Sequence, residues 1–163
     1  MRKKVLILSC LMLHGALAKE TPDVFTPQTI LADGVDSTVS KNPYTGEEGP
    51  ARKGTVAATV NNVFLLNQAL LAPTPDASHI ESLTQTMRAL VPSLNVIGMF
   101  NFFSVDEWLS DNRQPGRILV AILYLQHSPE KVTETIRQRL DVIRSTAAIA
   151  FLTREIDALL GCR

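Results

Sequence analysis

Apolar residues recur at helical spacing over most of the chain after Gly54, and this pattern predicts a helical domain. The first periodic segment begins at Thr55, and Asn67 lies on its apolar face, where its amide should bond a neighbouring backbone or a water. Pro73 and Pro75 should end this helix. We expect its apolar stripe to pack on the core: Val56, Val60, Val63, Phe64, Leu70 and Leu71.

The second segment has the clearest start signal in the chain. Ser78 and Glu81 have the spacing of a capping box, in which each side chain bonds the other residue's backbone amide. Pro92 should end the helix. Its apolar stripe is predicted to face the core: Ile80, Leu83, Met87, Leu90 and Val91.

Two apolar segments, 94–103 and 117–126, are ambiguous between helix and strand. Residues 118–125 form an uninterrupted apolar run, which suits either a buried strand or a buried helix. A strand there would need 94–103 as its pairing partner, and the fold would then be α+β. The helical pattern of the rest of the chain favours helix. Between the two segments, Ser104 and Glu107 form a second capping box that should open a short helix.

The C-terminal part is predicted to contain a broken helix. Ser128 and Pro129 form a start signal, and no proline or glycine follows until Gly161, which should end the last helix. The apolar face changes side along this stretch, so either the helix breaks or one long helix buries opposite faces at its two ends; we favour a break or kink near 144–147. Together the patterns predict an all-α domain at 54–163 with four to six helices.

Residues 19–53 show no sustained period and contain several prolines and glycines, so we expect an irregular N-terminal arm. Within this arm, the stretch 42–46, Asn-Pro-Tyr-Thr-Gly, indicates a turn.

The first eighteen residues have the plan of a secretory signal peptide. Residues 2–4 are basic, residues 5–17 are almost wholly apolar, and Ala16 and Ala18 supply the small residues of a cleavage site. We expect cleavage after Ala18 and a periplasmic or secreted protein. The minor alternative is a lipoprotein, because residues 8–10, Leu-Ser-Cys, resemble the box before a lipidated Cys10.

Cleavage changes the charge and the cysteine content. The whole chain has 16 basic and 16 acidic residues, and removal of three basic ones leaves 13 against 16, a net charge of −3. This balance argues against nucleic-acid binding. The longest apolar run is too short for a transmembrane segment. Cys162 would be the remaining cysteine, either a free thiol or the site of a disulfide-linked homodimer.

Catalytic patterns are weak. Asp106, Glu107 and Asp111 cluster around Trp108, and with His79 or His127 they could serve a small exported hydrolase. Carboxylates in the first turn of a helix, however, are favoured by the helix dipole without any catalytic role. Zinc-ligand spacing and the nucleophile elbow are both missing from the sequence. We therefore predict no catalytic, cofactor-binding or metal-binding residues.

The remaining surface features favour binding. We expect an exported helical protein that binds a protein partner in the bacterial envelope, as an adaptor, inhibitor or chaperone-like factor. The candidate contact residues come from the aromatic stretch: Phe100, Phe102, Phe103 and Trp108. The alternatives are the hydrolase and a carrier that holds a small apolar ligand in a cavity between 94–103 and 118–125.

Overall fold

The computed structural model describes residues 23–31, 38–146 and 149–161. The expected cleavage site after Ala18, together with Cys10 and Cys162, lies outside these residues. None of the described helices is long and apolar enough to cross a membrane.

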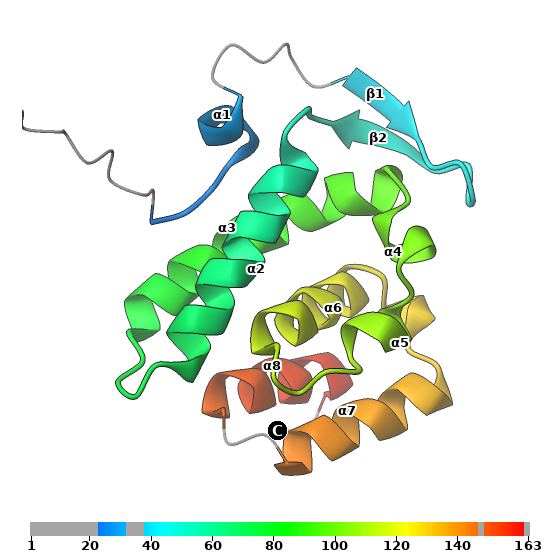
Figure 1. Cartoon of the computed structure of the whole chain (residues 1–163). Coiled ribbons are helices and arrows are strands. Elements are labelled where there is room, and N and C mark those ends of the chain that lie inside the picture. Colours follow the sequence, from blue (N-terminus) through cyan, green and yellow to red (C-terminus); the bar gives the residue numbers. More distant parts are fainter. Residues whose placement is uncertain (1–22, 32–37, 147–148, 162–163) are drawn as a thin grey trace, which may run out of the picture.

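Longer helices surround a central one, so the expected mostly helical fold is confirmed (Figure 1). Helix α6 (Pro115–His127) packs against α2 (Thr55–Leu71) and α3 (Ala77–Val96) on one side and against α8 (Ala150–Leu160) on the other. Residues 118–125 of α6 are all buried. A helix covered on every side has no polar stripe, which explains the apolar run without a period.

The α+β alternative is wrong, because neither ambiguous segment forms a strand. Residues 117–126 lie within α6, and 94–103 contains the end of α3, a turn at Gly98 and the single-turn helix α4 (Met99–Phe102). Gly98 has a φ of 78°, and a Cβ there would lie 3.1 Å from the Tyr44 ring. Glycine therefore suits both the conformation and the close contact.

The capping box at Ser104 and Glu107 is confirmed. The backbone N–H of Ser104 donates to Glu107 Oε2 at 2.6 Å, and that of Glu107 donates to Ser104 Oγ at 3.3 Å. These bonds begin the single-turn helix α5 (Val105–Trp108). The capping box expected at Ser78 is wrong, because the N-cap of α3 is Asp76, whose carboxylate accepts from the N–H groups of Ser78 and His79.

The irregular arm is wrong for most of residues 38–51. Strands β1 (Thr38–Lys41) and β2 (Glu48–Ala51) form an antiparallel hairpin in which Lys41 lies opposite Glu48. The expected turn at 42–46 joins them, and Asn42 Oδ1 accepts from the N–H groups of Tyr44 and Thr45. A further single-turn helix, α1 (Pro27–Ile30), lies beside the start of α2.

The hairpin explains why α3 does not end at Pro92, as the sequence predicted. Helix α3 continues to Val96, and its last turn is bonded to the hairpin. Asn42 Nδ2 donates to the carbonyl of Asn95 at 2.6 Å, and Ser93 Oγ donates to the carbonyl of Pro50 at 2.9 Å. These long-range contacts stabilise a turn that a proline inside a helix disfavours.

The expected break near 144–147 is confirmed. Helix α7 (Glu134–Thr146) ends there, α8 follows from Ala150, and Gly161 caps α8 with a φ of 73°. The start at Pro129 gives only the single 3-10 turn η1 (Pro129–Lys131) before α7 begins. Glu155 of α8 is buried and accepts from Arg88 of α3 and Gln126 of α6, which anchors α8 to both helices.

Candidate functional site

The apolar stripe of α2 faces largely outward, and the expectation that it packs on the core is wrong for four of its residues. Val60 is 61% exposed, Phe64 59% and Leu71 56%, and Val56 is exposed as well. Leu70 is buried as expected. The buried face of the helix is a neighbouring one: Thr55, Ala58, Thr59, Asn62, Leu66 and Leu70.

Two polar residues on the buried face of α2, Thr59 and Asn62, are satisfied by hydrogen bonds, which makes their burial possible. Thr59 Oγ1 donates to the carbonyl of Thr55 at 2.9 Å. Asn62 is fully buried, and its amide accepts from the N–H of Phe25 and donates to the carbonyl of the same residue, both at 2.7 Å. Residues 23–31 are thereby held against α2. Nothing in the local pattern marked Asn62, because its partner lies 37 residues away.

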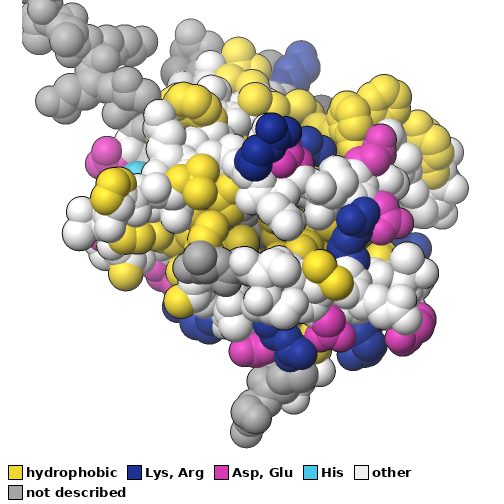
Figure 2. Space-filling view, turned by 60° about the horizontal axis from the view of Figure 1, so that its bottom comes forward, with side chains coloured by type: hydrophobic (Ala, Val, Ile, Leu, Met, Phe, Trp, Pro, Cys, Tyr) yellow, Lys and Arg dark blue, Asp and Glu magenta, His cyan; other side chains and the backbone are white. Residues whose placement is uncertain are grey.

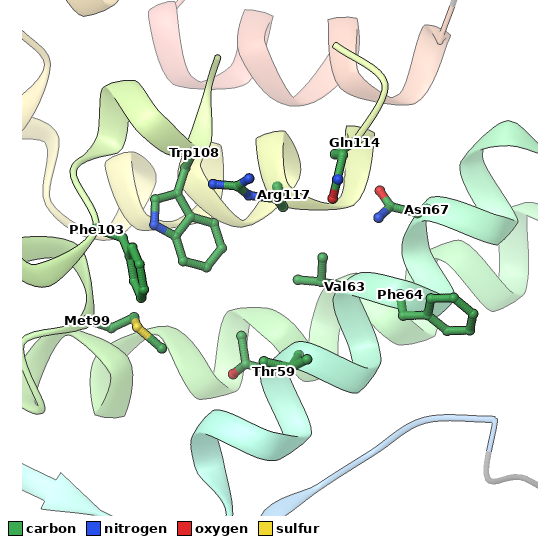
Figure 3. A pocket seen from close by; sticks show the side chains of 10 residues that line it. Thr59, Val63, Phe64, Asn67, Met99, Phe103, Trp108, Gln114 and Arg117 are labelled. Atoms are coloured by element: carbon green, nitrogen blue, oxygen red, sulfur yellow. The ribbon is translucent and has the colours of Figure 1, made fainter. Parts of the chain in front are cut away.

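A groove of about 460 Å³ lies between α2 and the segment from α4 to the start of α6 (Figure 3). Val63 and Asn67 project from α2, and Trp108, Gln114 and Arg117 face them across the opening. Its complete lining is mainly apolar: Thr59, Val60, Val63, Phe64, Asn67, Met99, Phe103, Trp108, Gln114 and Arg117. The groove is therefore an apolar surface with a few polar groups in its walls.

Of the four aromatic residues predicted to contact a partner, Phe103 and Trp108 line this groove. Phe100 is buried and stacks on Tyr124, with ring centroids 3.9 Å apart. Its contact joins 94–103 directly to 118–125, where the carrier hypothesis needs a cavity. Phe102 is 69% exposed and packs edge-on against Phe103, so it stands at the surface outside the lining.

Close contact between α2 and α6 fixes the floor of the groove. A Cβ on Gly116 would lie 2.6 Å from the carbonyl oxygen of Val63, so only glycine allows the two helices to approach this closely. The N–H of Gly116 donates to Asn67 Oδ1 at 2.8 Å. The predicted bond from Asn67 to a neighbouring backbone is confirmed.

Arg117 is the cation in the groove wall. Its guanidinium lies 5.5 Å from the centroid of the Trp108 ring and donates to the carbonyl of Glu107 at 3.2 Å. Within the described part of the chain, no carboxylate lies at ion-pair distance from it. Arg113, which lines an adjoining hollow, is paired with Asp111 at 3.0 Å.

Comparison with known proteins identifies a family. Residues 46–128, just over half of the chain, match a family described as a domain of unknown function, DUF7709. The chain belongs to the DUF7709 family. No curated protein and no solved structure matches it. The DUF7709 region contains β2 and the helices from α2 to α6, so every residue that lines the groove lies within it, whereas α7 and α8 follow it.

Two of the candidate catalytic carboxylates in the DUF7709 region, Glu107 and Asp111, bond residues other than a histidine. Glu107 caps α5, and hydrogen bonds from Ser104 hold its pKa below the usual range. The pKa of Asp111 is lowered by its hydrogen bond from Arg113. Asp106 is exposed in the same turn as Glu107.

The histidines lie on other elements, His79 in the first turn of α3 and His127 at the end of α6. The hydrogen bonds of the described residues do not join Glu107 or Asp111 to either histidine. The described ranges also contain no cluster of three or more potential metal ligands. The hydrolase alternative stays a prediction without a catalytic contact to support it.

Proposed function

We propose that this chain is an exported protein that binds a protein partner in the cell envelope through the groove beside α2, as an adaptor, inhibitor or chaperone-like factor. The observation that carries the proposal is the exposed stripe of α2, where Val60, Phe64 and Leu71 are each more than half exposed. An exposed apolar surface next to a groove is typical of a protein-binding site. Figure 2 shows one face of the molecule on which apolar side chains are exposed, and acidic and basic side chains lie close to one another around them.

The dimensions of the stripe favour a helical segment of the partner. Val56 and Leu71 are fifteen residues apart on α2, a distance of about 22 Å along the helix axis. An amphipathic helix of similar length could lie along it, as in other helix-in-groove complexes. A small apolar ligand would favour a site that encloses most of its surface.

A photo-crosslinking experiment tests the proposal. Benzoylphenylalanine replaces Phe64 on α2 or, as the control, Val142 on α7, which is also exposed. In cells of the native host, we expect a discrete adduct from position 64 that is absent from position 142. Val60→Asp, which puts a charge into the stripe, should remove it. The absence of an adduct, or the same adducts from both positions, would contradict the proposal.

Export rests on the pattern of residues 1–18 and has its own test. The mass of the exported chain should correspond to a protein that begins at Lys19. A diacylglycerol adduct on Cys10 would instead support the lipoprotein alternative.

The homodimer through Cys162 is also a proposal. It predicts a dimer on a non-reducing gel that is lost in Cys162→Ser. A monomer under oxidising conditions would identify Cys162 as a free thiol.

A further inference from the structure

We infer that the occupant of the groove is an amphipathic helix of the partner that carries an acidic side chain within its apolar face, and that this carboxylate pairs with Arg117. The inference rests on the proposed function and adds the chemistry that the groove selects. Arg117 lies in the wall opposite Val63, so a helix that covers Val63 also covers the guanidinium (Figure 3).

Arg117 forms no ion pair among the described residues; its charge acts on Glu107 and Asp111 only at longer range, where it helps to lower the pKa of both carboxyls. Its hydrogen bond goes to the backbone carbonyl of Glu107, and one face of its guanidinium lies over the Trp108 ring. The other arginine of this region, Arg113, is paired with Asp111 in two hydrogen bonds. The two arginines, four residues apart, therefore differ in one respect: a carboxylate is in direct contact with Arg113 but not with Arg117.

The absence of a carboxylate next to Arg117 becomes important when a partner covers the groove. An apolar partner would displace water from Arg117, and a cation that loses its water is costly unless a carboxylate takes the place of that water. A carboxylate matches the planar guanidinium through two parallel hydrogen bonds. The Gln114 side chain, in the same wall, makes no hydrogen bond within the described residues and can contribute a second polar contact.

A selection experiment tests the inference with the full chain as bait. The probe is a displayed library of 16-residue amphipathic helical peptides, in which central positions of the apolar face are randomised among Glu, Gln, Leu and Lys. For the wild-type chain we expect Glu to be enriched about tenfold over Gln at one central position. Arg117→Gln should abolish this preference, and the matched control Arg113→Gln should retain it. Circular dichroism must show that each variant keeps the wild-type helix content.

The outcomes separate this inference from the proposed function. Peptides that bind the wild type but not Val60→Asp, and that show no preference for Glu, would overturn the inference and leave the proposed function standing. Failure to enrich any peptide over the Val60→Asp bait would overturn both.

Separate measurements distinguish the partner helix from two other possible occupants of the groove, a second copy of the chain and a small apolar acid. A wild-type dimer that Val60→Asp dissociates, measured by light scattering, would assign the groove to a second copy of the chain and overturn the inference. Saturable binding of dodecanoate that Arg117→Gln abolishes, with no peptide enriched, would assign it to a small apolar acid and overturn it as well.

Discussion

Helices α2 and α3 carry similar apolar stripes in the sequence, but the fold uses them in opposite ways. In α3, Leu83 and Met87 are fully buried, whereas Phe64 and Leu71 of α2 are mostly exposed. A periodic apolar stripe therefore identifies a face on which a helix can pack, and the other elements of the fold decide whether it does.

The two helices differ in what lies beside the stripe. The other side of α3 carries Glu81, Gln85 and Arg88, so only one face of this helix can enter the core. Beside the stripe of α2 lie Ala58 and Leu66, together with Thr59 and Asn62, whose side chains find hydrogen-bond partners when buried. Helix α2 can thus pack through this second face, while Val60, Val63 and Phe64 of the stripe line the groove.

The same substitution, leucine to alanine, should have very different effects on stability in the stripes of α3 and α2. Leu83→Ala removes a fully buried side chain from α3, and it should lower the free energy of unfolding by about 3 kcal/mol. Leu71→Ala removes a side chain that is more than half exposed on α2 and should lower it by less than about 0.5 kcal/mol. Urea denaturation measures both. Equal losses would show that the α2 stripe is packed.

The next effect concerns the contact of α2 with α6. Gly116→Ala places a methyl group 2.6 Å from the carbonyl of Val63, so the helices must separate. We expect a loss of about 2 kcal/mol in the free energy of unfolding. The same variant should also weaken crosslinking from position 64, because the separation changes the groove. Wild-type stability would mean that the two helices are further apart than described.

A smaller effect tests the face of α2 that is buried in place of the stripe. Asn62→Ala leaves the N–H and carbonyl of Phe25 without their partners and should destabilise the fold by about 1.5 kcal/mol. Hydrogen exchange at the Phe25 amide should accelerate. The neighbouring variant Asn61→Ala serves as the control and should leave this exchange rate unchanged. Unchanged exchange in Asn62→Ala would contradict the assigned contact.

The smallest effect concerns α5, which holds Trp108 opposite α2. The Ser104 hydroxyl, then its backbone N–H, lowers the pKa of Glu107. Because the folded pKa lies below the unfolded one, the stabilisation is present above the usual carboxyl pKa and is lost as the pH falls through the lowered value. Ser104→Ala should raise the pKa of Glu107 towards its usual range, measured by NMR titration. An unchanged pKa would show that the hydroxyl does not bond the carboxylate.

The parts of the fold that could be predicted are those set by local pattern. The α3 stripe, the cap at Ser104, the break after α7 and the final Gly161 each depend on residues close in sequence, and the structure has all of them. In the candidate site, Phe103 and Trp108 were predicted as contact residues on composition alone, and both line the groove.

The remaining features depend on residues far apart in sequence. The hairpin stabilises α3 beyond Pro92 through contacts such as Asn42 with Asn95, which no local pattern reveals. The groove could not be predicted either, because it needs α2 to turn its second face to the core and Asn62 to find Phe25. Arg117 had no sequence signal, since the absence of a carboxylate in direct contact with it among the described residues is a property of the fold.

Hydroxyl-radical footprinting of the free, unmutated chain tests most directly whether the α2 stripe is exposed. Mass spectrometry of the oxidised protein would compare Phe64 on α2 with the buried Phe100, and would follow Met87 on α3 as the buried residue of the other stripe. We expect rapid oxidation of Phe64 and protection of both Phe100 and Met87. Protection of Phe64 equal to that of Phe100 would contradict the exposed stripe and, with it, the binding groove.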